Sequence, residues 1–75
     1  MSVDVMISPV ARIGETAGQV WHYLDLNGPI SVTGLAQELE VPRDLAMQAI
    51  GWLAREDKVE ITETGRTKLI SLKSG

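Results

Sequence analysis

The segment at residues 41–56, VPRDLAMQAIGWLARE, is the longest uninterrupted helical pattern in the chain, and it constrains what the rest can fold into. At about 100° per residue, one side of this helix would carry an apolar set: Ala46, Ala49, Ile50 and Leu53. The opposite side would carry a presented set: Asp44, Met47, Gln48, Gly51 and Arg55. Pro42 suits the first turn, where its missing N–H costs nothing, and β-type residues after Asp57 end the pattern. The segment therefore predicts an amphipathic helix with a buried face and a face free for a partner.

The size of the chain limits both its core and its chemistry. Its 75 residues make one domain, and a chain this short buries only about 60% of the surface that its unfolded form exposes. There is no cysteine, so no disulfide or cysteine zinc site can supplement the core, and the one histidine cannot hold a metal alone. We therefore expect no metal and no cofactor. No charged-then-apolar signal segment opens the chain and no apolar run approaches the roughly 18 residues of a membrane span, which predicts a cytoplasmic protein without a membrane partner.

The charges are divided unevenly along the chain. The formal net charge of −3 argues against a surface that attracts nucleic acid as a whole, because phosphate neutralisation needs Lys and Arg in number. Residues 1–40 contain one basic side chain and five acidic ones, a net −4, whereas residues 41–75 contain six basic and five acidic, a net +1. The second half therefore predicts a weak basic patch, built from Arg43, Arg55, Lys58, Arg66, Lys68 and Lys73.

The first ten residues show no helical period and include a proline, so we expect an extended arm at residues 1–10. Val3, Val5 and Ile7 alternate with other residues, as in a strand laid on a surface; a frayed terminus is the alternative. The arm precedes the folded domain, which we place at residues 11–75.

Helical spacing begins at residue 11 and continues to residue 27. Its apolar face contains Ile13, Ala17, Val20, Trp21 and Leu24. Gly28 can take the left-handed conformation that closes a helix, and Pro29 forbids its continuation. His22 points away from the apolar face and has no second ligand or nucleophile nearby, which is typical of a solvated side chain.

A short helix follows, and a turn leads from it into the long helix. Ile30 can make a brief extended pairing, and Ser31 is a candidate N-cap for a helix that runs to about Glu40. Residues 40–42 then form the turn, with Glu40 at the position where glycine is commonest in helix-turn-helix units.

Two apolar runs at the C-terminal end predict a β-hairpin. Residues 59–62 alternate apolar and polar, residues 63–66 contain a turn glycine, and residues 67–72 are again β-branched and apolar. Leu69 and Ile70 are both apolar and adjacent, so either of them could face inward, and the sequence leaves two pairing registers for the second strand, one residue apart. Matching Val59 and Ile61 favours Ile70 and Leu72 as the inward pair.

This order of elements is that of a winged helix-turn-helix domain, an α+β fold, mostly α, with three helices and a C-terminal two-stranded hairpin wing. The stretch GPISVTGLAQELEVPRDLAMQAIGWLAREDKVEI resembles the general pattern of these domains. IGETAGQVWHYL together with GWLAREDK resembles, more closely, a small bacterial winged-helix family of unknown function. The resemblance covers roughly residues 11–73 and concerns the fold, since a fold does not by itself define an activity.

The resemblance implies a role in binding double-stranded DNA, as in transcriptional regulators. In DNA-binding members the outward residues of the third helix enter the major groove, and the wing meets the backbone or minor groove. The residues that would do so here are Arg43, Met47, Gln48, Arg55, Arg66 and Lys68. The amide of Gln48 can pair with adenine. Asp44 weakens the binding we expect, although an acid near a helix N-terminus also has a structural reason in the helix dipole.

The same helix permits a different function, as a protein interaction or dimerisation module that does not bind DNA. Leu45 and Trp52 are seven residues apart and widen its apolar arc beyond that of an ordinary surface helix. The N-terminal arm, the hairpin or a second copy of the chain could cover this flank. Gly51, beside Trp52, indicates either close approach of another backbone or a tolerated glycine. The candidate interface is therefore Leu45, Gly51 and Trp52.

The sequence contains no catalytic constellation. It has no paired histidine and carboxylate, no nucleophile beside a base, no metal-ligand cluster and no glycine-rich phosphate loop. We therefore expect no catalytic residues and no enzyme.

Overall fold

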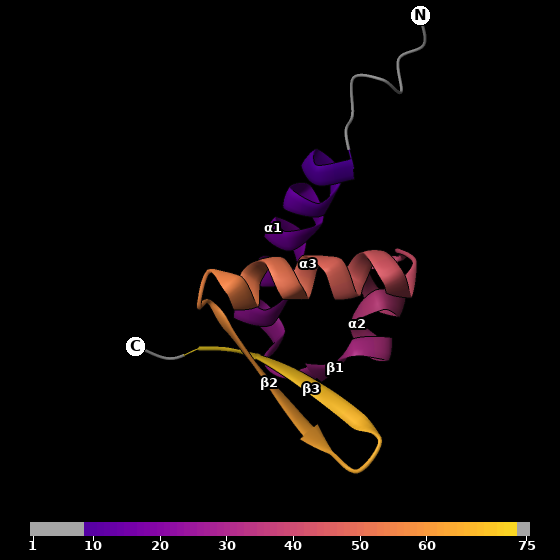
Figure 1. Cartoon of the computed structure of the whole chain (residues 1–75). Coiled ribbons are helices and arrows are strands. Elements are labelled where there is room, and N and C mark those ends of the chain that lie inside the picture. Colours follow the sequence, from indigo (N-terminus) through magenta and orange to yellow (C-terminus); the bar gives the residue numbers. More distant parts are fainter. Residues whose placement is uncertain (1–8, 74–75) are drawn as a thin grey trace, which may run out of the picture.

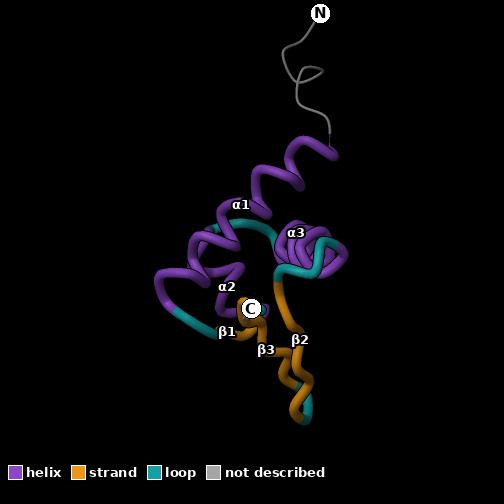
Figure 2. The backbone as a smooth tube through the Cα atoms, turned by 90° about the vertical axis from the view of Figure 1, so that its left-hand side faces the viewer, coloured by secondary structure: helices purple, strands orange, loops and turns teal. Residues whose placement is uncertain are grey.

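The computed structural model describes residues 9–73, in which three helices pack against a small sheet (Figure 1). The elements are α1 (Pro9–Asn27), β1 (Ile30–Ser31), α2 (Val32–Leu39), α3 (Arg43–Arg55), β2 (Val59–Thr64) and β3 (Thr67–Leu72). The predicted winged helix-turn-helix order is confirmed. Helices α1 and α3 cross, and the β2–β3 hairpin, which is the wing, extends away from them (Figures 1 and 2).

The arm prediction is wrong at its last two residues. Pro9 and Val10 belong to α1, which therefore begins two residues earlier than the periodicity indicated. Proline is tolerated at the first helical position because its missing N–H has no helical partner there. The rest of the predicted arm, residues 1–8, lies outside the described residues. Pro42 is also one position off, since it is the N-cap of α3 rather than part of its first turn.

Left-handed residues close the helices at the predicted places. Gly28 has a φ of 87°, and its N–H donates to the Leu24 carbonyl at 2.9 Å. Glu40 closes α2 with a φ of 56°, and Asp57 follows α3 with a φ of 64°. The hydrogen bonds after α3, from Asp57 to Ala54 and from Lys58 to Leu53, form a Schellman motif without glycine. The stop at Glu40 leaves only three residues between α2 and α3, which keeps these two helices close together.

The sheet is antiparallel in the order β1-β3-β2, so β3 is its central strand. Ile30 pairs with Ile70, and Ile70 also pairs with Ile61 on the other side. The predicted brief pairing of Ile30 is confirmed, and so is the inward position of Ile70, which is fully buried. A two-residue turn joins Thr64 to Thr67, with Gly65 at a φ of 60°, as a type II′ turn requires at its first central position.

The core is aliphatic and lies between the three helices and the inner face of the sheet. Its buried members are Ala17, Val20, Leu24, Val32, Leu35, Ala49, Ile50, Leu53, Val59 and Ile70. The predicted inner face of α3 is confirmed, because Ala46, Ala49, Ile50 and Leu53 are all buried.

Two apolar residues predicted to point inward do not. Trp21 is 40% exposed, because α1 crosses α3 at an angle and only part of its apolar stripe faces the core. Ile61 is 43% exposed even though it lies directly opposite Ile70. The reason is that β2 is an edge strand, and β3 separates it from β1 at the other edge of the sheet.

Candidate nucleic-acid interface

The outward face of α3 is the central element of the candidate interface. Asp44, Gln48, Gly51 and Arg55 are exposed and follow one another at spacings of four, three and four residues, which is one stripe of a helix. The stripe contains one acid at its N-terminal end, one amide in the middle and one guanidinium at its C-terminal end. It can therefore present hydrogen-bonding groups and a cation along one line.

Met47, which the sequence predicted to face DNA, is not one of the exposed residues of this stripe. Its side chain is half-buried and packs against the hydrophobic core. At 100° per residue, Met47 lies on the same side as the buried Ile50, three residues further on. The sequence grouped Met47 with the outward set, and the packing of the core covers part of its side chain.

Three of the predicted cations converge at one place, although they come from different parts of the chain. Arg43 at the start of α3, Arg66 at the wing turn and Lys68 on β3 line one hollow of about 180 Å³. We call it the basic hollow; its other lining residues are Ser31, Val32, Thr33 and Thr67. Arg66 and Lys68 of the wing thus lie beside the first residues of α2 and of α3, the two helices of the helix-turn-helix.

The N-terminus of α2 adds to the positive potential of the basic hollow. Ser31 caps the helix as predicted, since its hydroxyl oxygen accepts a hydrogen bond from the Gly34 N–H at 3.0 Å. The first turn of α2 contains no acidic residue, so no side-chain charge offsets the partial positive charge of the helix end. By contrast, α3 has Asp44 in its first turn. The hollow therefore combines three cationic side chains with the positive pole of a helix, which together favour an anion.

Ion pairs leave the cations unequally available. Lys68 Nζ lies 3.9 Å from Glu63, its partner across the hairpin, and Lys58 Nζ lies 3.4 Å from Glu56. Lys73 donates a hydrogen bond to Asp57, and this bond, with the charge of the carboxylate, raises the pKa of Lys73 above its usual value. Within residues 9–73, Arg43, Arg55 and Arg66 take part in none of the ion pairs, which leaves their guanidinium groups open to an external anion.

Arg55 does not join the basic hollow. It lies at the opposite end of α3, where it lines a groove with Ile13, Gln48, Gly51, Trp52 and Glu56. The predicted basic patch is therefore divided into a cluster of three at one end of α3 and a single arginine at the other. The two Lys residues engaged with Glu56 and Asp57 lie near this second end, at the base of the wing.

The predicted alternative interface is only partly formed. Trp52 is 38% exposed, and its ring lies over Gly14 of α1, where an added Cβ would be 3.9 Å from the Cζ2 atom of Trp52. The first helix thus covers one side of Trp52, a contact that we did not predict. Gly51 has open space around it, because a Cβ placed there would meet nothing within 4 Å. Within the described residues no backbone approaches Gly51, and Leu45 is half-buried.

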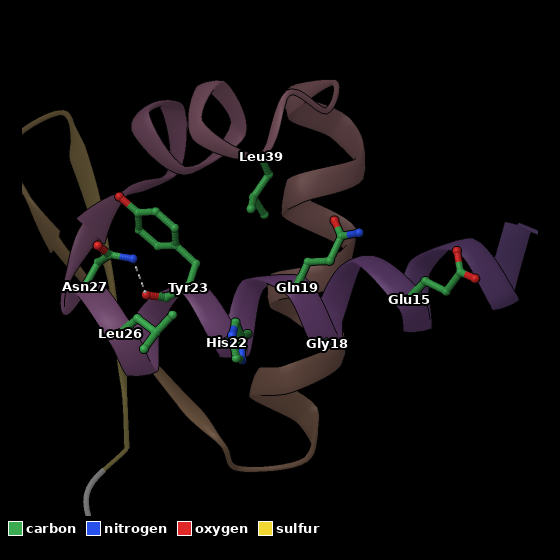
Figure 3. A pocket seen from close by; sticks show the side chains of 8 residues that line it. All are labelled: Glu15, Gly18, Gln19, His22, Tyr23, Leu26, Asn27 and Leu39. Atoms are coloured by element: carbon green, nitrogen blue, oxygen red, sulfur yellow. Dashed lines mark hydrogen bonds between the residues drawn. The ribbon is translucent and has the colours of Figure 1, made fainter.

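A separate shallow hollow of about 640 Å³ lies between α1 and the end of α2 (Figure 3). Leu39 points from α2 toward α1, and Tyr23 and Gln19 lie on either side of it in this view. The Asn27 side-chain amide donates a hydrogen bond to the Tyr23 carbonyl oxygen at 3.0 Å. This bond satisfies a carbonyl group in the last turns of α1. His22 is exposed, as predicted, at the edge of the hollow. Most of the exposed surface of this hollow is apolar.

No group of three or more His, Asp or Glu side chains in residues 9–73 is placed to hold a metal ion. In the same residues, no helix combines the length and the apolar character that crossing a membrane requires.

Three helices, a turn of three residues between α2 and α3, and a hairpin beside α3 define the winged helix-turn-helix class. The matched region of the sequence, residues 7–72, is described as a winged helix-turn-helix domain (DUF2582). The chain belongs to this family.

The relatives of the chain include proteins from archaea and bacteria. The uncharacterized protein MJ1608 of Methanocaldococcus jannaschii is 37% identical over 65 residues, which span 83% of this chain and 91% of that protein. The solution NMR structure of protein BT2368 from Bacteroides thetaiotaomicron matches with a TM-score of 0.75 at 36% identity, covering 81% of this chain and 74% of that one. The family that the sequence resembled is thus confirmed, and it is not confined to bacteria.

A more distant structure has the same fold. Reduced HlyU from Vibrio cholerae matches with a TM-score of 0.64 at 24% identity, covering 85% of this chain and 73% of that one. At this identity the match concerns the fold alone.

Sequence reasoning missed three polar residues of the basic hollow, Ser31, Thr33 and Thr67. Ser31 was recognised only as a cap. The sequence did contain a signal, since the helix before the predicted third helix has a cap residue and no acidic residue in its first turn. Nothing in the sequence indicated that Thr67 of the wing would lie beside that helix start, because this depends on how far the hairpin turns back toward α2.

Proposed function

We propose that this chain binds double-stranded DNA, weakly, and acts as a transcriptional regulator. Helix α3 would lie in the major groove, and the basic hollow would hold the phosphate backbone. The observation that carries the proposal is the convergence of Arg43, Arg66 and Lys68 beside the N-terminus of α2. In helix-turn-helix proteins the first helix of the unit crosses the backbone while the second enters the groove. A cationic hollow at the start of both helices is where that arrangement needs positive charge.

The proposal assigns different tasks to different residues. Arg43, Arg66 and Lys68 would neutralise phosphates and contribute little to sequence preference. Gln48, exposed in the middle of the outward stripe, would pair with adenine. Asp44 and the net charge of −3 oppose binding, which is why we expect weak affinity at physiological salt. In this proposal the chain works by binding and performs no catalysis.

The proposal is tested by the salt dependence of binding. Three neutralised phosphates predict a slope of about −2.7 for the logarithm of the association constant against the logarithm of salt concentration, or roughly 40-fold weaker binding when salt rises fourfold. The measurement is fluorescence anisotropy of a labelled random duplex, titrated at low and moderate salt. Absence of binding even at low salt would remove DNA from the proposal.

Single substitutions separate the basic hollow from general electrostatics. Arg43→Ala or Arg66→Ala should each weaken binding for all sequences alike and reduce the salt slope by about 0.9. Lys73→Ala is the matched control, because it removes the same charge from a lysine already engaged with Asp57 at the base of the wing. If Lys73→Ala weakened binding as much as the two arginine variants, net charge rather than the basic hollow would govern affinity.

A second pair of variants tests the position of α3. Gly51→Glu places an acid in the middle of the outward stripe without crowding the fold, since the space around Gly51 is open. Helix propensity also favours glutamate over glycine, so the variant should be at least as stable as the parent while binding falls below detection. Gln48→Ala should change the preference among duplex sequences and leave the salt slope intact.

The alternative is that the chain is a protein interaction or dimerisation module. The partial exposure of both tryptophans, 40% for Trp21 and 38% for Trp52, favours it, because tryptophan is enriched among residues that anchor interfaces. The solution mass of the parent and of Trp52→Ser separates the two candidates. A dimer that the substitution converts to a monomer would support the alternative, and a monomer in both cases would exclude self-association.

A further inference from the structure

The groove that contains Arg55 lies between the first turns of α1 and the outward face of α3. Its volume is about 540 Å³, three times that of the basic hollow. We call it the α1–α3 groove. Ile13 and Trp52 give it apolar walls, Gly51 leaves its floor without a side chain, and Gln48, Arg55 and Glu56 form its polar rim.

The first turns of α1 form one wall of this groove and bury little apolar surface of their own. The buried residues of α1 begin at Thr16, whereas Val10 is 59% exposed and Ile13 is half-buried. In Figures 1 and 2 these turns project beyond α3 on the side away from the sheet. A helix normally gains its stability by burying an apolar face, so this end of α1 needs a cover that residues 9–73 do not supply.

We propose that the N-terminal segment of this chain, residues 1–8 (MSVDVMIS), is that cover and docks in the α1–α3 groove. The segment joins the described chain at Pro9, and Ile13 lies only about 6 Å further along α1. Five extended residues span about 17 Å, more than the roughly 10 Å of α3 from Gln48 to Arg55. The segment is therefore long enough to turn at its last residues and run the length of the groove.

The composition of the segment fits the groove. Val3, Val5 and Ile7 alternate, so an extended chain would turn three aliphatic side chains to one side, toward Ile13 and Trp52. Asp4 is the only charged side chain in residues 1–8. Arg55 on the rim takes part in none of the ion pairs of the described chain, whereas Glu56 is paired with Lys58. A single acid on the segment thus meets a single available cation on the groove.

A tethered segment also has an advantage over a second copy of the protein. A short linker gives its own segment an effective concentration in the millimolar range, far above that of another molecule in dilute solution. A stable dimer, moreover, requires roughly 1,200 Å² or more of buried surface, and the groove is lined by only six residues. The size of the site fits a short peptide.

Docking would have a regulatory consequence, because Gln48 and Arg55 belong both to the groove and to the outward stripe of α3. The segment and DNA would then compete for the same face. This consequence rests on the proposed DNA binding, whereas the docking itself does not and is tested without DNA.

The two tryptophans allow a direct test in the full chain. In a Trp21→Phe background, Trp52 is the only tryptophan and reports on the groove. Replacing Val3, Val5 and Ile7 together by serine should raise the acrylamide quenching of Trp52 roughly twofold, because collisional quenching follows the accessible surface of the ring. The matched control is a Trp52→Phe background, in which Trp21, which does not line the groove, should be quenched equally with and without the three serines.

The outcomes distinguish the possible occupants of the groove. Unchanged quenching of Trp52 would overturn the proposal, and protection that grows with protein concentration would overturn it in favour of a second copy. Far-UV circular dichroism establishes that the serine variant keeps its helices. Charge reversal gives an independent measurement: Asp4→Arg should raise the quenching of Trp52, and adding Arg55→Glu should restore the protection. Failure of that restoration would exclude the pairing of Asp4 with Arg55.

Discussion

Replacing Gly51 by alanine should stabilise the fold, because nothing in residues 9–73 packs against this glycine inside α3. A Cβ at this position meets nothing within 4 Å, and Gly51 is not among the residues with a positive φ. Glycine in a helix interior costs about 1 kcal/mol relative to alanine, mainly through the greater freedom of the unfolded chain. With no contact to offset this gain, Gly51→Ala should raise the free energy of unfolding by nearly that amount, which corresponds to about 4–8 °C in Tm for a domain of this size.

The matched comparison is Gly34→Ala, in the first turn of α2. A Cβ there would lie 3.1 Å from Ile30 Cγ1 and 3.1 Å from Ser31 Oγ, closer than ordinary contacts. The methyl group would push against the cap that holds the Gly34 N–H, and loss of an N-cap costs about 1 kcal/mol. Gly34→Ala should therefore be neutral or destabilising, although helix propensity alone predicts a gain.

Urea unfolding followed by circular dichroism measures both variants, with the slope against denaturant as a check that the unfolded states are alike. If Gly51→Ala lowered stability, something beyond residues 9–73, such as the docked N-terminal segment, would have to lie against Gly51 too closely for a methyl group. If both variants were stabilised equally, the close approach at Gly34 would be refuted.

Four further substitutions test the core, a helix end and an ion pair. Ile70→Ala should cost about 2–5 kcal/mol because it empties the centre of the sheet, whereas Ile61→Ala, at a 43% exposed position directly opposite, should cost under about 1 kcal/mol; chemical unfolding distinguishes them. Glu40→Gly should raise stability by about 0.5–1 kcal/mol in the same assay, because Glu40 holds a φ of 56°, and a decrease would mean that its side chain makes a contact worth more than the strain. The pairing of Lys73 with Asp57 raises the pKa of the lysine above 10.5, so its contribution to stability is fully present below that pH and is lost as the pH rises through the folded-state value. Asp57→Asn should return the pKa of Lys73 to its usual value in an NMR titration, and an unchanged pKa would refute the pairing.

Local chemistry made the helix ends predictable. Gly28, Ser31 and Glu40 each act through the backbone of their immediate neighbours, by a left-handed φ or a side-chain cap, and each lies where the sequence indicated. The start of α1 at Pro9 was missed because proline is compatible both with an extended arm and with a first helical position.

The candidate site was predictable in its parts. Arg43, Arg66 and Lys68 were identified as separate cations on a helix and a wing, and their meeting beside Thr33 and the start of α2 was not. That meeting depends on the pairing of β3 with β1, which brings the wing to the start of α2. Met47 shows the opposite case. Its spacing along the helix predicted an outward position, but part of its side chain packs against the core.

The sequence alone therefore determined the elements of this protein, their order and the buried side of α3, because these follow from the spacing of apolar residues and from interactions over a few residues. The tertiary structure decided which apolar side chains at the edges of those faces are covered. It left Trp21, Trp52 and Ile61 partly exposed, and it brought three of the basic residues into one hollow while Arg55 stayed apart. The physical reason is that periodicity along one helix or strand is a one-dimensional property. Which apolar side chains are covered depends on how α1 crosses α3, and which basic side chains meet depends on how the wing lies against α2. Both arrangements are set by the packing of the whole core.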